Sequence, residues 1–281
     1  MSGMLYLVAT PIGNLGDLSP RAAETLDSVD FIAAEDTRVT LKLLNYFGIK
    51  KPLISYFEHN RRQSGEKILE RLLRGENVAL VSDAGMPAIS DPGEDLVRLC
   101  AGAGVSVVVV PGPSAAVSAL AASGLPTQRF TFEGFLSGSN KKRREHLESL
   151  REETRTMILY EAPHKLVGTL EDLREVFGGE RELSLCREMT KLHEEVIRST
   201  IDGALDLYLR IPPKGEYVLV LRGREERKGP ETSLEDALER VEFYRGDGES
   251  LKQAARLASE DTGFSKNELY DAAVEKSKRG T

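Results

Sequence analysis

The stretch Leu80-Val-Ser-Asp-Ala-Gly-Met-Pro-Ala-Ile-Ser-Asp-Pro-Gly93 follows directly from a short apolar run, 78–81, that has the composition of a buried strand. After Val81 the chain changes at once to small, polar and helix-stopping residues. Ligands of open α/β sheets bind in the crevice at the carboxyl ends of the strands. A long Gly- and Pro-rich loop in that place therefore predicts a ligand site.

Two acids of this loop, Asp83 and Asp91, are expected to have different roles. The segment Asp91-Pro-Gly-Glu94 has the form of a capping box, with an acid at the N-cap, Pro at the first helical position and Glu at the third. Asp91 is therefore predicted to begin a helix. Asp83 comes straight off the strand, and the small residues Ala84 and Gly85 after it let a ligand reach the backbone. Asp83 is the better candidate for ligand contact.

The same alternation of strand and helix runs through residues 1–124. The other short apolar runs, each ending in turn or cap residues, are Met4 to Ala9, Val29 to Ala34, Leu53 to Tyr56 and Val105 to Val110. The last of them is almost entirely β-branched, which is typical of a parallel strand buried on both faces. The sequence predicts an N-terminal α/β domain over residues 1–124, with parallel strands and helices on both faces of the sheet.

Residues 125–224 are predicted to form a second α/β domain after a linker at 125–128. The strand candidates are Arg129 to Phe135, Thr156 to Glu161, Leu183 to Arg187, Glu195 to Thr200 and Tyr217 to Leu221, and the helix candidates are Lys141 to Glu153 and Lys165 to Val176. Between the third and fourth strands there is no room for a helix, which predicts antiparallel pairing and a mixed sheet.

A charged linker over 222–230 precedes a small C-terminal domain, residues 230–281. Its sequence predicts three amphipathic helices, Ser233 to Tyr244, Ser250 to Thr262 and Ser265 to Lys276. The turn between the last two, 261–266, resembles a helix-turn-helix corner. Nucleic-acid contact and a role as an inert appendage are both compatible with this pattern.

Composition limits the classes of function. The chain has 281 residues, 40% of them hydrophobic and 30% charged, and its formal net charge of −7 argues against indiscriminate nucleic-acid binding, although a local basic patch is compatible with it. No apolar run approaches the roughly 18 residues of a membrane span, and the start lacks a signal-peptide pattern, so a cytoplasmic location is expected. Cys100 and Cys186 are expected to be reduced and buried, and the Cys and His spacing predicts no metal site.

Further charged groups follow the second predicted strand. Glu35, Asp36 and Arg38 lie just past its carboxyl end, which is the ligand side of a parallel sheet. The structural alternative is that Asp36 or Thr37 caps the next helix while Arg38 pairs with an acid. Both interpretations stay open from these residues alone.

One basic cluster stands out in the second half. Lys141, Lys142, Arg143 and Arg144 follow the flexible segment 137–140. A mobile basic loop beside a cleft would hold a phosphate backbone, whereas the structural alternative is a solvated loop. Phosphate binding by a Gly-rich loop is unsupported, because Pro11 stands where the first Gly of a dinucleotide fingerprint belongs and no Gly-Lys-Ser/Thr occurs.

Several motifs, taken in order, closely resemble the ribosomal RNA small subunit methyltransferase I family of the tetrapyrrole methylase superfamily. They are Thr10-Pro-Ile-Gly-Asn14, Glu35-Asp-Thr-Arg38, Ser82-Asp-Ala-Gly-Met-Pro-Ala-Ile-Ser-Asp-Pro-Gly93, Pro111-Gly-Pro-Ser-Ala115, Glu133-Gly-Phe-Leu136, Tyr160-Glu-Ala-Pro-His164 and Arg187-Glu-Met-Thr-Lys191. The resemblance extends from about residue 4 to residue 224, and the helical tail resembles the C-terminal domain of that family. Ser137 and Lys165 depart from the usual Pro and Arg of the family.

This resemblance implies a homodimeric enzyme that uses S-adenosylmethionine, bound between two α/β domains, to methylate the ribose 2′-hydroxyl of a cytidine in the decoding region of 16S rRNA, with the small ribosomal subunit as partner. By resemblance to the superfamily, the cofactor would contact Asp83, Met86, Ser114 and Ala115, and its pocket would be lined by Ile12 and Tyr160. Such a ligand carries no phosphate, which agrees with the missing phosphate loop.

The roles in the reaction are assigned from the charges at the strand end. Glu35 and Asp36 are the candidates for base or hydroxyl positioning, Arg38 for a phosphate or carboxylate clamp, and the cluster 141–144 for RNA contact. Two alternatives are a methylase of a tetrapyrrole-like small molecule and a non-enzymatic rRNA-binding assembly factor.

Overall fold

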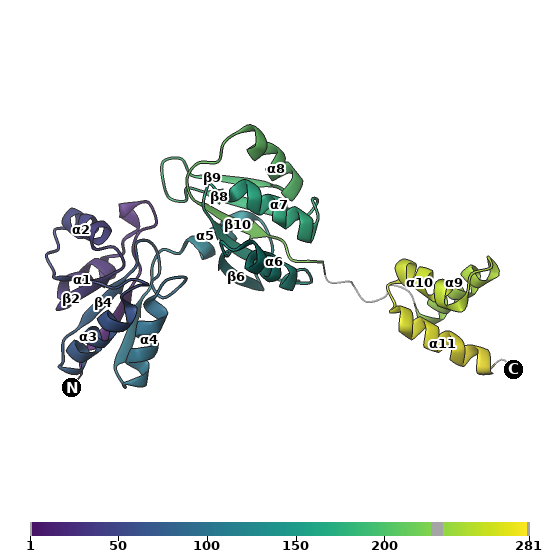
Figure 1. The fold of residues 1–281 in the computed structure, drawn as a ribbon, viewed down its shortest axis with the longest axis horizontal. Helices are drawn as coiled ribbons and strands as arrows, with labels where there is room; N and C mark the ends of the chain where they lie inside the picture. The colour runs from purple at the N-terminus through teal and green to yellow at the C-terminus, as the bar shows by residue number, and fades with distance from the viewer. Residues whose placement is uncertain (1, 226–232, 280–281) are drawn as a thin grey trace. The chain divides into compact units, whose positions relative to one another are not determined.

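The structure is a computed structural model that describes residues 2–225 and 233–279. The chain forms two compact units, Met1–Arg224 and Glu225–Thr281, which are described separately (Figure 1). Most of the predicted linker 222–230 lies outside the described residues. The predicted division of the first unit at residues 124 and 125 stays a prediction.

The first sheet consists of five parallel strands, as the sequence predicted. They are β1 (Met4–Val8), β2 (Phe31–Ala34), β3 (Leu53–Ser55), β4 (Val78–Val81) and β5 (Ser106–Val110), in the order β3-β2-β4-β1-β5. Helices α1 (Pro20–Ser28) and α2 (Thr37–Tyr46) pack on one face, and α3 (Arg61–Leu73) and α4 (Gly93–Gly102) pack on the other. The carboxyl ends of all five strands therefore meet at one edge.

Burial of β5 on both faces was predicted wrongly. Among the described strands, β5 lies at the edge of the sheet and pairs with β1 alone, and Val109 is 48% exposed. The helix that follows it, α5 (Ala115–Ser123), packs on the second sheet instead of returning to the first. A run of β-branched residues specifies a strand but not its position in the sheet.

The second sheet is mixed, as predicted. Its strands are β6 (Phe130–Phe135), β7 (Thr156–Glu161), β8 (Glu182–Arg187), β9 (Glu195–Thr200) and β10 (Tyr217–Leu221), in the order β6-β7-β10-β8-β9. The β6–β7 pair is parallel and the other pairs, including β8–β9, are antiparallel. The predicted architecture of one parallel and one mixed α/β sheet is thus confirmed.

Three helices cover one face of the second sheet: α6 (Asn140–Ser149), α7 (Leu166–Phe177) and α8 (Ile201–Arg210). The sequence-based prediction missed α8. Its signals are an N-cap at Thr200, whose hydroxyl accepts from the Gly203 N–H, and buried residues at helical spacing, Ile201, Ala204, Leu205 and Tyr208.

Helix α5 covers the other face of the second sheet and so connects the two sheets (Figure 1). Ala116, Ala119 and Leu120 pack against residues of β7, β8 and β10. At the end of the helix, the Arg198 guanidinium donates from Nε to the Ser123 carbonyl at 3.0 Å and from a terminal nitrogen to the Ala122 carbonyl at 2.5 Å. A cation from β9 thereby satisfies carbonyls that the helix itself leaves without partners.

The second unit contains the three predicted helices, α9 (Leu234–Gly246), α10 (Leu251–Thr262) and α11 (Lys266–Arg279), around a small alanine-rich core. Ser233 and Asp236 form a capping box at α9, and Gly263 ends α10 in the left-handed conformation with φ +81°. In the described part of the chain, no helix has the length and apolar character needed to cross a membrane. Cys100 and Cys186 are buried free thiols, as predicted.

The packing of α5 generates a stability prediction. Ala119 is fully buried against the second sheet, whereas Ala121 on the same helix is exposed. An Ala119→Leu variant should lose about 1–3 kcal/mol of unfolding free energy, because extra methyl groups force the helix away from the sheet. The matched Ala121→Leu control should change by no more than about 0.5 kcal/mol. Urea unfolding measures both, and equal losses would contradict the close packing.

Candidate functional site

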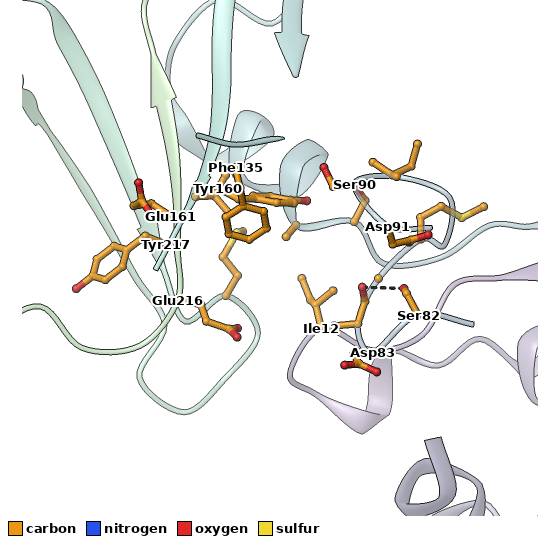
Figure 2. A pocket seen from close by; sticks show the side chains of 18 of the residues that line it. Ile12, Ser82, Asp83, Ser90, Asp91, Phe135, Tyr160, Glu161, Glu216 and Tyr217 are labelled. Atoms are coloured by element: carbon orange, nitrogen blue, oxygen red, sulfur yellow. Dashed lines mark hydrogen bonds between the residues drawn. The ribbon is translucent and has the colours of Figure 1, made fainter. Parts of the chain in front are cut away.

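A cavity of about 500 Å³ lies where loops of the first sheet meet the second sheet (Figure 2). This volume is within the roughly 300–1,000 Å³ that is typical of small-molecule sites. The first sheet contributes residues that follow β1, β2, β4 and β5, and the second sheet contributes the ends of β6 and β7, the loop after β8 and the start of β10. The cavity therefore lies at the carboxyl edge of the parallel sheet, where the sequence predicted a site.

The structure brings together many of the residues singled out in the sequence. Every predicted cofactor contact lines this cavity: Ile12, Asp83, Met86, Ser114, Ala115 and Tyr160. Of the three catalytic candidates, Glu35 lines it, whereas Asp36 and Arg38 are not among the described residues that do so. The basic cluster 141–144 is likewise absent from the described lining. The chemical roles of all these residues stay predictions.

The loop after β4 is held against the loop after β1 by two backbone hydrogen bonds. The Thr10 N–H donates to the Gly85 carbonyl at 2.9 Å, and the Gly85 N–H donates to the Thr10 carbonyl at 3.0 Å. Gly85 has φ +80°, and a Cβ atom there would approach Cγ2 of Ile12 to 3.3 Å. Glycine at this position allows both the backbone conformation and the close approach of the two loops.

The predicted capping box at Asp91 does not form. Helix α4 begins at Gly93, and its N-cap residue, Pro92, makes no side-chain capping hydrogen bond. The Asp91 carboxylate instead accepts from the Gly93 N–H at 2.7 Å and from the Ala88 N–H at 2.9 Å. Asp91 therefore has a structural role, as expected. Its Oδ1 atom joins the start of α4 to the preceding loop, because it accepts from both Gly93 and Ala88. Burial raises the pKa of this carboxyl group, partly offset by these hydrogen bonds.

Backbone strain is concentrated in two loops beside the cavity. The non-glycine residues of the described chain with positive φ are Ala88, Ser90, Glu188 and Thr190, at +48° to +67°. The first two lie in the loop after β4, and the other two lie in the loop after β8. Left-handed conformations of such residues cost about 1–3 kcal/mol each and persist where the surroundings enforce them. Such clustering is typical of ligand-binding loops.

Two carboxylates, Glu35 and Asp83, are fixed side by side at the ends of the neighbouring strands β2 and β4. Asp83 Oδ1 accepts from the Asp36 N–H at 2.9 Å, and Glu35 Oε2 accepts from the Asp83 N–H at 3.4 Å. The pKa of Glu35 is raised, first by burial and then by the negative charge of Asp83. A carboxyl group with a raised pKa is a better proton acceptor near neutral pH than an ordinary one.

Asp36 and Arg38 adopt the structural alternative. Asp36 is the N-cap of α2, and its Oδ1 accepts from the Arg38 N–H at 2.8 Å. Its carboxylate also pairs with the Arg38 guanidinium at 2.6 Å, and that hydrogen bond holds the pKa of Asp36 at about 2. The Arg38 side chain is 87% exposed. A carboxylate with so low a pKa is a weak base, which leaves Glu35 as the stronger candidate.

The start of α5 presents polar groups to the cavity. Ser114 occupies the N-cap position of α5, but its side chain makes no capping hydrogen bond. The Ala116 N–H of the first turn instead donates to the Tyr160 hydroxyl at 3.2 Å. Burial raises the pKa of Tyr160, so its phenol stays protonated at neutral pH. Tyr160 is therefore held in place by the helix that joins the two sheets.

The wall formed by the second sheet contains groups that the sequence-based prediction did not assign. Lys191 lines the cavity, and its Nζ donates to Glu188 and to Glu216 at 2.9 Å each. Burial lowers the pKa of Lys191, but hydrogen bonds and charge from the two carboxylates outweigh it, so the pKa is raised overall. Met189 adds an apolar side chain to the same wall of the cavity. The available signal was the motif 187–191, which was noted only as part of a resemblance.

The basic cluster is not a mobile loop. Lys141, Lys142, Arg143 and Arg144 lie in the first turns of α6. Arg143 forms an ion pair with Asp172, and Arg144 pairs with Glu175 at 2.7 Å, both acids being on α7. The expected mobile loop was wrong, because these residues form the start of a helix, where Arg143 and Arg144 pair with acids of the neighbouring α7. Phosphate contact by the cluster stays a prediction, and the exposed Lys141 and Lys142 take no part in the pairs with α7.

Comparisons with known proteins agree with this geometry. Residues 4–204 match the model of the Tetrapyrrole (Corrin/Porphyrin) Methylases, and residues 248–277 match that of the RsmI C-terminal HTH domain. A protein of Synechocystis sp. named Ribosomal RNA small subunit methyltransferase I is 49% identical over 273 residues, which cover 97% of this chain and 98% of that protein.

Two solved structures share the fold of the first unit. The methyltransferase CobJ superposes with a TM-score of 0.60 at 19% identity, covering 81% of this chain and 97% of that one. The uroporphyrin-III C-methyl transferase from Thermus thermophilus, complexed with S-adenyl homocysteine, superposes with a TM-score of 0.55 at 17% identity, covering 78% and 97%. At such identities these structures support the fold alone.

The carboxylates of the neighbours Glu35 and Asp36 should have opposite effects on the free energy of unfolding at neutral pH. The pKa of Glu35 is raised above 4.5, so the folded state binds more protons than the unfolded state. The stability of the fold therefore falls as pH rises from 4.5 to the raised pKa. Glu35→Gln should therefore raise the urea midpoint at pH 7. The pKa of Asp36 is depressed from 3.8 to about 2, so its stabilisation is present above pH 3.8 and lost below it. Asp36→Asn should lower the midpoint at pH 7.

Urea unfolding followed from pH 7 down to pH 3 tests both signs. The gain from Glu35→Gln should shrink as pH falls below the raised pKa of Glu35 and vanish below 4.5. The loss from Asp36→Asn should narrow only below 3.8. Shifts of the same sign at pH 7 would contradict the opposite environments of the two carboxylates.

Proposed function

The chain belongs to the ribosomal RNA small subunit methyltransferase I family of the tetrapyrrole methylases, and from this premise we propose that it methylates the ribose 2′-hydroxyl of a cytidine in the decoding region of 16S rRNA. Methyl transfer itself follows from the family, and so does the cofactor, S-adenosylmethionine. The choice of acceptor is the proposal. The observation that most supports the proposed methyl transfer is the cavity. All the cofactor contacts implied by the family resemblance line it together with Glu35.

The residues of the cavity fit the cofactor. Ile12 and Met86 provide apolar and polarisable walls for the adenine and the thioether chain, and Asp83 provides a negative charge for the amino group or the sulfonium. Ser114 has a hydroxyl that makes no capping bond. When bound, S-adenosylmethionine supplies a methyl group activated by the positive charge on sulfur.

The chain's own residues would then position the acceptor and move a proton. A ribose hydroxyl is a poor nucleophile, so proton removal contributes about 10²–10⁴-fold in rate. Glu35 is the proposed proton acceptor, because it lines the cavity and its pKa is raised by burial and by Asp83. Orientation of the reactants in the cavity can supply several of the ~7–11 kcal/mol available from positioning.

The proposed substrate is ribosomal RNA rather than a small molecule. Supporting observations are the near full-length likeness to a ribosomal RNA methyltransferase and the match of residues 248–277 to a helix-turn-helix domain. The proposed organisation is a cytoplasmic homodimer with domains at 1–124, 125–224 and 230–281, and the C-terminal helices are proposed to assist in RNA contact.

The acceptor is tested by mapping the product. Purified protein with labelled S-adenosylmethionine should transfer its label to small ribosomal subunits, and nuclease digestion with mass spectrometry should identify 2′-O-methylcytidine in the decoding region. Free 16S rRNA and a porphyrinoid serve as alternative acceptors. Label on the porphyrinoid alone would identify a small-molecule methylase. Cofactor binding without transfer to any acceptor would favour an assembly factor.

Substitutions of Asp83 and Glu35 should have different effects, the first on cofactor binding and the second on the rate of methyl transfer. Asp83→Asn should weaken S-adenosylmethionine binding in calorimetry by about tenfold or more, because a charge-assisted contact of about 1.5–3 kcal/mol is lost. Glu35→Gln should keep this affinity and slow single-turnover methylation by about 10²–10⁴-fold. Glu58→Gln is the matched control, since Glu58 follows β3 at the same edge and is exposed. Normal turnover in Glu35→Gln would exclude Glu35 as the base.

A further inference from the structure

Two apolar side chains, Phe135 and Ile89, line the cavity and yet remain open to solvent. Phe135 is 61% exposed and Ile89 is 52% exposed. Figure 2 shows the Phe135 ring directed into the space between the two sheets. Scattered exposed apolar residues are ordinary on protein surfaces. These two differ from such residues because local distortions of the backbone direct both of them into the same cavity.

The distortion at Phe135 is a β-bulge in β6. Phe132 pairs with Ile158 of β7, but the next pairs are Gly134 with Leu159 and Phe135 with Tyr160, so Glu133 is an extra residue. In a regular strand, Phe132 and Phe135 would point to opposite faces of the sheet. The bulge places both on the face of Ile158 and Tyr160, which is the face toward α5. Bulges beside active sites commonly redirect a side chain in this way.

The distortion at Ile89 is a pair of left-handed residues. Ala88 and Ser90 on either side of it have φ values of +67° and +63°. The Asp91 carboxylate holds this conformation through the Ala88 N–H. The two distortions also meet, because a Cβ atom on Gly134 would lie 2.9 Å from Oγ of Ser90. The loop that carries Ile89 therefore touches the bulge that directs Phe135.

Other aromatic rings support Phe135 from behind. Its ring centroid lies 5.3 Å from that of Tyr160, which in turn lies 5.0 Å from Phe132. The Tyr160 hydroxyl is anchored by the Ala116 N–H. Phe135 thus rests on a fixed ring while most of its own surface is exposed, which makes it a platform for a flat ligand.

We propose that Phe135 and Ile89 form a nucleobase clamp, in which the base of the acceptor nucleotide stacks on the Phe135 ring and contacts Ile89. The proposal rests on the proposed function. Proteins that recognise single-stranded RNA bind bases that have left the stack, and these bases stack on aromatic side chains. Because every base has a π-face, the clamp positions the acceptor without selecting its identity.

The acceptor base suits this place better than the adenine of the cofactor. Most of the proposed cofactor contacts, among them Asp83, Ser114 and Ala115, come from loops of the first sheet, whereas Phe135 comes from the second sheet. Phe135 and Ile89 keep more than half of their surface toward solvent, which is the side from which a macromolecule approaches. Their exposure leaves an apolar surface that a base of the RNA can cover.

The test compares Phe135→Ala, Phe135→Trp and Phe130→Ala. Phe130 is the matched control, because it lies on the same strand, is 42% exposed and is absent from the described cavity lining. With small ribosomal subunits and saturating S-adenosylmethionine, Phe135→Ala should lower kcat/KM by about tenfold or more, as expected for a lost stacking contact. Phe135→Trp should retain most activity, and Phe130→Ala should match the unsubstituted protein.

Calorimetry with S-adenosylmethionine and thermal melting provide the deciding readouts. The clamp predicts that cofactor affinity and melting temperature stay unchanged in Phe135→Ala while kcat/KM for RNA falls. A parallel loss of cofactor affinity would assign the ring to adenine and overturn the proposal. So would an unchanged kcat/KM in Phe135→Ala, or an equal loss in Phe135→Trp. If the unsubstituted protein binds the cofactor but methylates no RNA, the proposed function fails first, and the clamp fails with it.

Discussion

The packing of α5 against the second sheet is the interaction on which the rest of the first unit depends. This helix follows the edge strand β5 of the first sheet, but its buried residues Ala116, Ala119 and Leu120 belong to the core of the second. Alanines let the helix approach the sheet closely, and Arg198 fixes its carboxyl end. One rigid element therefore belongs to both halves. The cavity between them has a defined shape because α5 fixes both of its walls.

The same helix explains why the site combines groups of different origin. The start of α5 places Ser114 and Ala115 in the cavity wall and anchors the Tyr160 hydroxyl of the second sheet. On the first sheet, the parallel pairing of β2 and β4 brings Glu35 and Asp83 together, and their proximity raises the pKa of Glu35. Two like charges side by side destabilise the fold at neutral pH. Their position at a cavity is consistent with selection for chemistry rather than for stability.

Patterns that are local in sequence predicted the fold well. Apolar runs that end in turn or cap residues correctly located the strands of both sheets, and the structural role expected for Asp91 is confirmed by its hydrogen bonds to the Ala88 and Gly93 N–H groups. The errors came from contacts distant in sequence. The edge position of β5 depends on where α5 packs, and the ion pairs of Arg143 and Arg144 depend on acids of α7. The direction of Phe135 depends on a single extra residue in the pairing of β6 with β7.

That last dependence links folding to function. A bulge weakens the hydrogen-bonded ladder, and the left-handed Ala88 and Ser90 add strain, yet both distortions lie at the cavity and touch each other through Ser90 and Gly134. The hydrophobic cores on both sides of each sheet supply the stability that offsets this strain. Relaxing the bulge would return Phe135 to the opposite face of the sheet and remove an aromatic surface from the cavity. The strained loops are therefore better explained by the ligand they receive than by the fold they belong to.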